Sequence, residues 1–149
     1  HLSLRRQRQM CIRDRVMPYA ELVIGNESEA EAWAKASGME TNDLSSIAQK
    51  IADFHPGVEA AHSPYTHGAE STIRAVQGQS SVITHPTPKI DAANIVDTNG
   101  AGDAFAGGVI AGLIMGKSME EAVDVGHRLG GMCIGQVGPV LKFPKENVL

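Results

Sequence analysis

A run of small residues flanked by two acids lies in the second half of the chain, in the stretch NIVDTNGAGDAFAGG at residues 94–108. Asp97 precedes the turn Gly100–Gly102, and Asp103 follows it. If a helix begins here, the backbone amides of this turn lie at its N-terminus, where they have no partner within the helix and carry partial positive charge. Such amides bind phosphate well. The stretch therefore predicts an anion site with a carboxylate beside it.

Asp103 needs a chemical role in such a site, because a carboxylate repels a bound phosphate. The most economical role is that of a general base, which accepts the proton of a hydroxyl that attacks phosphorus. The alternative is a tight turn into a helix, with Asp103 as an ordinary acid of the first helical turn. Competing motifs do not fit: a P-loop needs a lysine, and a dinucleotide fingerprint needs a glycine where Phe105 stands. A calcium loop needs alternating oxygen ligands, which Ala101 interrupts.

The stretch DTNGAGDAFAGG closely resembles the second signature of the PfkB, or ribokinase-like, family of carbohydrate and nucleoside kinases. Two further segments, VMPYAELVIGNESEAEAWA and AVDVGHRLGGMCIGQVG, resemble members of this family that phosphorylate adenosine. The resemblance covers about residues 16–149 and fits the C-terminal part of the family's chain, well under half of it. It implies a ribokinase-like three-layer α/β/α sandwich, of which this chain holds only the C-terminal, ATP-side part.

The resemblance assigns the central stretch to phosphoryl transfer. Asp103 matches the catalytic base, which takes the proton from the 5'-hydroxyl of the nucleoside. Asp97 and Thr98 match the start of the signature, where they hold the turn and approach the ATP phosphates. The anion hole for the transferring γ-phosphoryl group matches the amides of Gly100, Ala101 and Gly102. Fixed donors of this kind stabilise the charge of a metaphosphate-like transition state.

Asn26 and Glu29 match the family's N-x-x-E motif, which is associated with Mg²⁺ and phosphate. The resemblance implies that Asn26 contributes to ATP binding and that Glu29 acts on the metal indirectly, through ordered water. The same pair is also a plain helix-capping pair, since Asn is a favoured N-cap and Glu three residues later completes a capping box. Both roles are compatible.

Three further positions match the nucleotide side of the family. Thr66 and Gly68, in THGAE, match the Thr-x-Gly loop that lines the phosphates. His127 matches a histidine on the helix that flanks the nucleotide base. A lone histidine on a helix is more often a packed or surface residue, so packing is the alternative for His127.

The resemblance thus implies ATP- and Mg²⁺-dependent phosphorylation of adenosine to AMP, with ADP as second product, in purine salvage. It implies adenosine and ATP as small-molecule partners, a monomer when full length, and a location in the cytoplasm, with the nucleus left open as a second location. Two alternatives stay open. One is another sugar or nucleoside kinase of the same family, because the half that contacts the acceptor is not visible. The other is a truncated, non-catalytic nucleotide-binding fragment, and the chain alone is expected to be inactive.

Composition excludes several other classes. The chain of 149 residues has a formal net charge of −4, which disfavours binding to nucleic acid or anionic membranes, and 4% aromatic residues, which disfavours a base-stacking surface. Cys11 and Cys133 are too far apart for a zinc pattern or a disulfide framework, which favours a reducing, intracellular setting. No stretch approaches the roughly 18 apolar residues of a membrane span.

Residues 1–15, HLSLRRQRQMCIRDR, differ from the rest of the chain because they are rich in arginine. A basic interaction arm is one interpretation. An appendage unrelated to the fold is the favoured one, since the segment has no helix or strand period that fits the elements expected after residue 15. Residues 16–149 then form the kinase portion.

Strands and helices alternate around Asn26, Glu29, Thr66 and Gly68, and this alternation predicts an α/β sheet covered by helices. A strand is expected at Glu21–Ile24, with Gly25 turning the chain into a helix from Asn26 to about Ser37. A second helix is expected at 43–54, with apolar residues at helical spacing. Residues 71–76 and 80–84 are expected to form a hairpin. In 58–65 a buried strand is expected to be interrupted by His62, Ser63 and Pro64.

The elements around the central stretch are a short strand and two helices. The segment ANIVD, at 93–97, is expected to be a strand that enters the glycine turn. One helix is expected from about Ala101 to Met115 and another from Ser118 to about Gly135. Ser118 and Glu121 form the capping box that opens the last helix.

Overall fold

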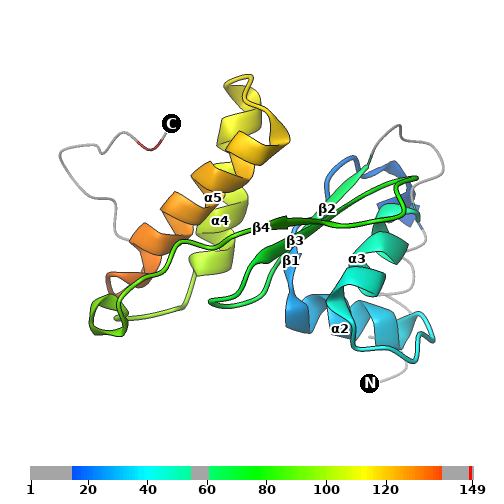
Figure 1. Ribbon diagram of the computed structural model, residues 1–149, viewed down its shortest axis with the longest axis horizontal. Coiled ribbons are helices and arrows are strands. Elements are labelled where there is room, and N and C mark those ends of the chain that lie inside the picture. The colour runs from blue at the N-terminus through cyan, green and yellow to red at the C-terminus, as the bar shows by residue number, and fades with distance from the viewer. Residues whose placement is uncertain (1–14, 55–60, 139–147, 149) are drawn as a thin grey trace. The chain divides into compact units, whose positions relative to one another are not determined.

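The computed structural model describes residues 15–54 and 61–138 together with Val148 (Figure 1). Residues 1–15, interpreted as an appendage in preference to a basic arm, therefore lie outside the described residues, except for Arg15. The chain divides into two compact units, residues 1–84 and 85–149, and each is described by itself.

Two capped helices form the helical layer of the first unit, after a short 3-10 helix, η1 (Met17–Tyr19). Helix α2 (Glu27–Ala36) begins after Asn26, whose side chain accepts from the Glu29 amide. Helix α3 (Leu44–Ala52) begins after Asp43, which caps it in the same way. Both predicted helices are confirmed, because their caps are local features of the sequence.

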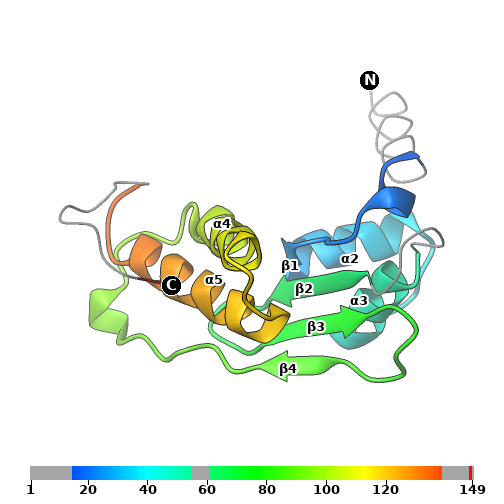
Figure 2. The ribbon, with the colours of Figure 1, turned by 90° about the horizontal axis from the view of Figure 1, so that it is seen from above.

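Four strands form one sheet in the order β1-β2-β3-β4 (Figure 2). They are β1 (Gly25–Asn26), β2 (His62–Thr66), β3 (Thr72–Val76) and β4 (Ile83–His85). β1 runs parallel to β2, and β2 runs antiparallel to β3, with Tyr65 opposite Ile73. The predicted hairpin is confirmed in β3 and β4, although β4 starts later than expected. The division between the two units falls inside β4.

The interruption expected at Pro64 is wrong, because β2 runs through this proline between β1 and β3. Proline has no N–H to donate to a ladder. His62 exchanges hydrogen bonds with Glu21 and Val23, so alternate residues of β2, including Pro64, face that side. The pairing there is broken between the isolated bridge Leu22–His62 and β1. The sheet therefore tolerates Pro64 with a gap in the β1 ladder, which also accounts for the short β1.

Gly25 does not turn the chain as expected; it is the first residue of β1. Its backbone has no positive φ. A Cβ at this position would lie 2.8 Å from Cε1 of Tyr65 and 3.0 Å from Oε2 of Glu29. Glycine is needed here because the Tyr65 ring and the Glu29 carboxylate crowd the strand.

The core of the first unit lies between the two helices and the two central strands. Its fully buried members are small or branched apolar residues on α2 and α3, packed on Tyr65 of β2 and Ala75 of β3. Trp33 and Phe54 meet edge to face beside this core, with ring centroids 6.1 Å apart. This packing holds α2 and α3 against β2 and β3.

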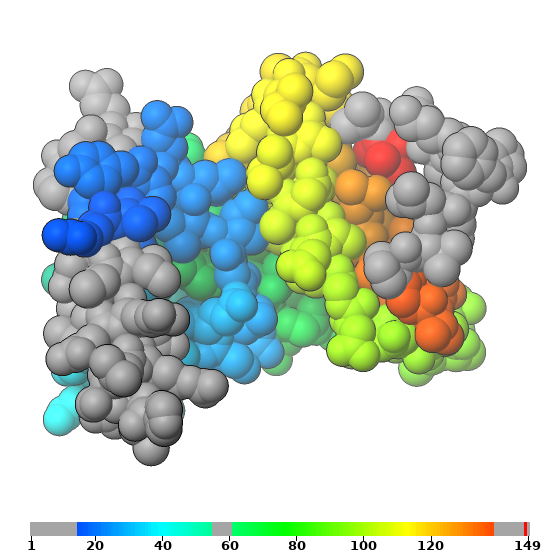
Figure 3. All heavy atoms as spheres, turned by 180° about the vertical axis from the view of Figure 1, so that it is seen from behind, coloured from blue at the N-terminus to red at the C-terminus, as the bar shows by residue number. Residues whose placement is uncertain are grey.

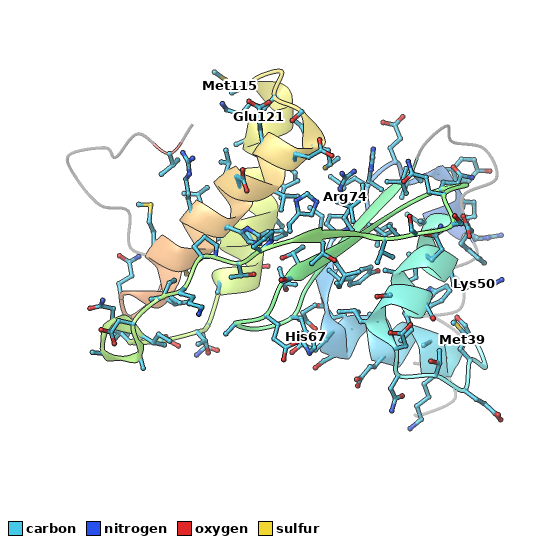
Figure 4. All side chains as sticks on the ribbon, viewed as in Figure 1. Met39, Lys50, His67, Arg74, Met115 and Glu121 are labelled. Atoms are coloured by element: carbon cyan, nitrogen blue, oxygen red, sulfur yellow. The ribbon has the colours of Figure 1, made fainter. Side chains whose placement is uncertain are left out.

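The second unit contains a short 3-10 helix, η2 (Ala92–Asn94), followed by α4 (Ala101–Ile114) and α5 (Met119–Ile134). Both long helices are confirmed, including the capping box of Ser118 with Glu121, which Figure 4 labels. The strand expected at 93–97 is wrong. Asp91 accepts from the Ala93 amide and starts η2, and the backbone after η2 donates to the end of α5 instead of to a neighbouring strand.

α4 and α5 pack against each other through glycines. A Cβ on Gly108 of α4 would lie 2.7 Å from the Cα of Gly126 on α5. A Cβ on Gly112 would lie 2.8 Å from the Cα of Ala122. The two backbones therefore approach more closely than side chains would permit.

The opposite side of α4 carries apolar side chains that are exposed. Ile110 and Ile114 are 48% and 79% exposed, and α4 contributes the yellow-green surface in Figure 3. Within the described residues, no helix is long and apolar enough to cross a membrane.

Candidate active site

The N-terminus of α4 differs from those of α2, α3 and α5. α2, α3 and α5 each begin with a side chain that accepts a hydrogen bond from the first turn. The N-cap of α4 is Gly100, which has no side chain and adopts the left-handed conformation with φ +81°. A Cβ at Gly100 would meet only Sγ of Cys133, at 3.6 Å, so the backbone conformation rather than crowding requires glycine here.

The amides of the first turn of α4 are the candidate anion hole. The Ala101 amide donates to the Thr98 carbonyl at 3.3 Å, and the Ala104 amide donates to Gly100. In the part of the chain that the structure describes, the Gly102 and Asp103 amides donate to no protein acceptor. A Cβ at Gly102 would meet no atom of the described residues within 4 Å. The turn thus leaves donors and space for an anion.

Asp103 and Asp97 occupy different positions around this turn. Asp103 is exposed in the first turn of α4, beside the available amides. The Asp97 carboxylate accepts from the Asn99 amide at 2.9 Å, so it shapes the turn that leads to Gly100. Thr98 is exposed between them. The structure therefore brings together all the candidates of the central stretch, with a carboxylate next to available amides.

The last turn of α5 forms hydrogen bonds with the segment that leads to Gly100. The Ile134 carbonyl accepts from the Val96 amide at 2.8 Å and from the Asp97 amide at 3.2 Å. The Cys133 thiol donates to the Asn99 carbonyl, with 3.6 Å between sulfur and oxygen. These contacts could not be predicted from the sequence, because a single cysteine on a helix belongs to no motif that would indicate its partner.

A second group of candidates meets at the carboxyl ends of the parallel strands β1 and β2, in the first unit. Asn26 pairs with Thr66, although 40 positions separate them in the sequence. The Thr66 hydroxyl lies 3.4 Å from the Gly25 carbonyl. Gly68 follows in an exposed turn with φ +54°, next to His67, which Figure 4 labels. The carboxyl edge of parallel strands is the common ligand side of open α/β sheets.

Asn26 and Glu29 form a complete capping box. The Asn26 side chain accepts from the Glu29 amide, and Oε2 of Glu29 accepts from the Asn26 amide, both at 2.9 Å. Burial, and then the charge of Glu29, raise the pKa of the Tyr65 phenol. Oε1 of Glu29 is not used by the capping box, and Glu29 is exposed, so its carboxylate can still accept from water. Capping and a water-mediated role are thus compatible.

His127 is 8% exposed and packs on Phe105 of α4, with ring centroids 5.4 Å apart. Burial lowers the pKa of His127; the charge of Asp124 opposes this shift, and His85 adds to it. This position favours the packing role for His127, and a direct contact with ATP stays a prediction.

The described residues contain no group of three or more His, Cys, Asp or Glu side chains that could hold a metal ion. A metal that relies on the oxygens of a bound phosphate and on water fits these residues better, because Mg²⁺ usually keeps several waters and binds through one or two carboxylates. The exposed Glu29 carboxylate, whose Oε1 lies outside the capping box, fits such a role.

Comparison with known proteins gives a family match over most of the chain. The profile of the family described as pfkB family carbohydrate kinase matches residues 4–146. Adenosine kinase of Schizophyllum commune is 42% identical over 139 residues, which cover 90% of this chain and 40% of that protein. Adenosine kinase of Saccharomyces cerevisiae is 43% identical over 136 residues, which cover 90% of this chain and 38% of that protein. The chain therefore spans well under half the length of these relatives.

Solved structures of an adenosine kinase and of a ribokinase also match this chain. Schistosoma mansoni adenosine kinase in complex with 2-fluoroadenosine matches with a TM-score of 0.81 and 30% identity, over 89% of this chain and 39% of that one. Thermotoga maritima ribokinase matches with a TM-score of 0.71 and 27% identity, over 83% of this chain and 38% of that one. The fold is therefore part of a ribokinase-like α/β fold, as expected.

Proposed function

Because the chain belongs to the pfkB family of carbohydrate kinases, we propose that it is the ATP-side part of an adenosine kinase, which transfers the γ-phosphoryl group of ATP to the 5'-hydroxyl of adenosine. The observation that carries this proposal is the uncapped N-terminus of α4, where the available amides of Gly102 and Asp103 lie beside the exposed Asp103 carboxylate. Adenosine is favoured over ribose, because fungal adenosine kinases are 40–43% identical and a Haemophilus influenzae ribokinase is 28% identical.

In this proposal Asp103 accepts the proton of the attacking hydroxyl, which makes the oxygen a better nucleophile. The amides of Gly100, Ala101 and Gly102 stabilise the charge on the transferring group. The contact of Ala101 with Thr98 is long, at 3.3 Å, so this amide can still turn toward an anion. Asp97 keeps the turn in shape for the phosphates.

Asn26, Thr66 and Gly68 are proposed to line the ATP phosphates from the ends of β1 and β2. Mg²⁺, held by the phosphates and through water by Glu29, would neutralise phosphate charge. We further infer that the complete protein is a monomer in the cytoplasm, with the nucleus as a second location left open. We also infer that the chain alone is inactive. Size-exclusion chromatography of the complete protein tests the monomer.

A chimeric kinase tests the catalytic proposal. The 139-residue segment of the Schizophyllum commune enzyme that matches this chain is replaced by the corresponding segment of this chain. We expect the chimera to form AMP from adenosine and ATP. Asp103→Asn is expected to lower kcat by about 10²- to 10⁴-fold, the usual contribution of general acid–base catalysis.

Asp124→Asn is the matched control, since Asp124 is also an exposed aspartate of the same unit, on α5. It is expected to leave kcat unchanged. Full activity of Asp103→Asn would refute the role of Asp103. The acceptor is tested on the complete polypeptide that contains this chain, where a higher kcat/KM for ribose than for adenosine would favour the sugar kinase alternative.

A further inference from the structure

The peptide that joins Asn99 to Gly100 is held by the last turn of α5. The Asn99 carbonyl accepts from the Cys133 thiol at 3.6 Å. The same sulfur lies 3.6 Å from the Cβ position of Gly100. Cys133 is 8% exposed, and its contact with the exposed Asn99 is partly buried. The thiol thus holds the carbonyl side of this peptide group, and a side chain added at Gly100 would meet the same sulfur.

The orientation of this peptide decides where the Gly100 amide points. In a trans peptide the C=O and N–H bonds point in opposite directions, because the group is planar. A carbonyl held toward Cys133 therefore directs the Gly100 N–H away from α5. Without such a contact the peptide could rotate, because glycine adopts positive and negative φ about equally well.

Other contacts hold neighbouring parts of this turn. The Ile134 carbonyl holds the amides of Val96 and Asp97. The Asp97 carboxylate holds the Asn99 amide. Among the described residues, the Cys133 thiol is the only group found to donate to the Asn99 carbonyl.

We propose that Cys133 is a positioning residue of the phosphoryl-transfer site: its thiol holds the Asn99 carbonyl and thereby aims the Gly100 amide toward the bound phosphate. This inference rests on the proposed function, since it needs an anion at the turn. In this role Cys133 contacts no substrate but orients the Gly100 amide, one donor of the anion hole.

The chimeric kinase tests this role through three variants. Cys133→Ala removes the donor and is expected to lower kcat about 3- to 5-fold, as suits a weak thiol hydrogen bond, with the KM for adenosine unchanged. Cys133→Ser keeps a donor of similar size and is expected to restore kcat to within about 2-fold. Val123→Ala truncates another buried residue of α5 and is expected to lower the melting temperature without changing kcat. Equal kcat values for the Ala and Ser variants, or for Cys133→Ala and Val123→Ala, would overturn the proposal.

Two readouts separate this inference from the proposed function. In the 149-residue chain with Cys11→Ser, the infrared S–H stretching band of Cys133 is expected at lower frequency than that of a free thiol; a band at the free-thiol frequency would overturn the contact. Calorimetry with inorganic tripolyphosphate is expected to show about 3- to 5-fold weaker binding for Cys133→Ala than for Val123→Ala. If the chimera forms no AMP but this difference appears, the proposed function fails and the positioning role stands. Absence of tripolyphosphate binding to the unchanged chain would overturn the positioning role.

Discussion

Gly107 and Gly108 are neighbours on α4 but lie in opposite surroundings, so alanine at each tests how the helix pair is packed. A Cβ at Gly107 would lie more than 4 Å from every atom in the part of the chain that the structure describes. A Cβ at Gly108 would lie 2.7 Å from the Cα of Gly126, 2.8 Å from the Val125 carbonyl oxygen and 2.9 Å from the Gly126 nitrogen. All three are backbone atoms of α5, so no side chain can rotate away. Since carbon atoms prefer separations of about 3.5–4.0 Å, the helices would have to separate by about 1 Å.

The expected effects combine two opposing contributions. Each alanine gains about 0.8–1.0 kcal/mol of helix propensity over glycine. Gly107→Ala is therefore expected to raise the free energy of unfolding by up to about 1 kcal/mol. Gly108→Ala makes the same gain but incurs an overpacking cost of about 1–3 kcal/mol. Because the propensity gain is common to both, the difference between the variants measures the overpacking alone.

Urea unfolding of the two variants and of the unchanged protein, followed by circular dichroism, measures these free energies. We expect Gly108→Ala to be less stable than Gly107→Ala by about 1–3 kcal/mol, toward the upper end because three backbone atoms are crowded. Equal stabilities within about 0.5 kcal/mol would refute the close packing of α4 on α5.

Three further predictions concern the sites. Gly100→Ala is expected to cost about 1–2 kcal/mol of stability because φ is +81°, and to lower AMP formation by the chimera; a kcat equal to that of the unchanged chimera would contradict the geometry of the turn. Asn26→Ala and Ser118→Ala each remove the side chain that caps a helix, and each should cost about 1 kcal/mol of stability in thermal unfolding. Only Asn26→Ala should raise the KM of the chimera for ATP. Equal KM values for the two variants would show that Asn26 acts only as a helix cap. Burial lowers the pKa of His127 below its ordinary value of 6.5, so the unfolded chain binds more protons in acid and stability should fall as the pH drops below that value. His127→Gln should flatten this part of the stability profile, measured by urea unfolding between pH 5 and pH 8, and an unchanged profile would assign the acid sensitivity to other groups.

Local signals account for the features that the sequence predicts well. Asn26 and Ser118 are each followed by a Glu three residues later, and each opens a helix through a complete capping box. Gly38 and Gly116 end the helices before them with positive φ. In the same way, the run around Asp103 specifies an uncapped helix start within a few residues. Such features depend on neighbours along the chain, so they need no knowledge of the fold.

The remaining features depend on residues that are distant in the sequence. Pro64 is typical of an interrupted strand, but pairing with β3 on its other side keeps β2 intact. Ile95 and Val96 have strand propensity, but they are 43% and 56% exposed and the Val96 amide bonds to the end of α5. Cys133 contacts the turn 34 positions earlier. Tertiary contacts override the local propensity of Pro64, Ile95 and Val96, and they alone determine the partner of Cys133.

The contact between Gly108 and Gly126 also limits how this sequence can change over generations. In most packed interfaces, a gain of volume on one side can be offset by a loss on the other. Here both residues are already the smallest that proteins use, and a Cβ on Gly126 would itself lie 2.8 Å from the Phe105 ring and 2.9 Å from the Phe105 carbonyl oxygen. No second substitution at the partner glycine can compensate a first one. We therefore expect both glycines to stay unchanged as the sequence evolves. The spacing of α4 and α5, and with it the position of Cys133 beside the Asn99–Gly100 peptide, should then also stay constant.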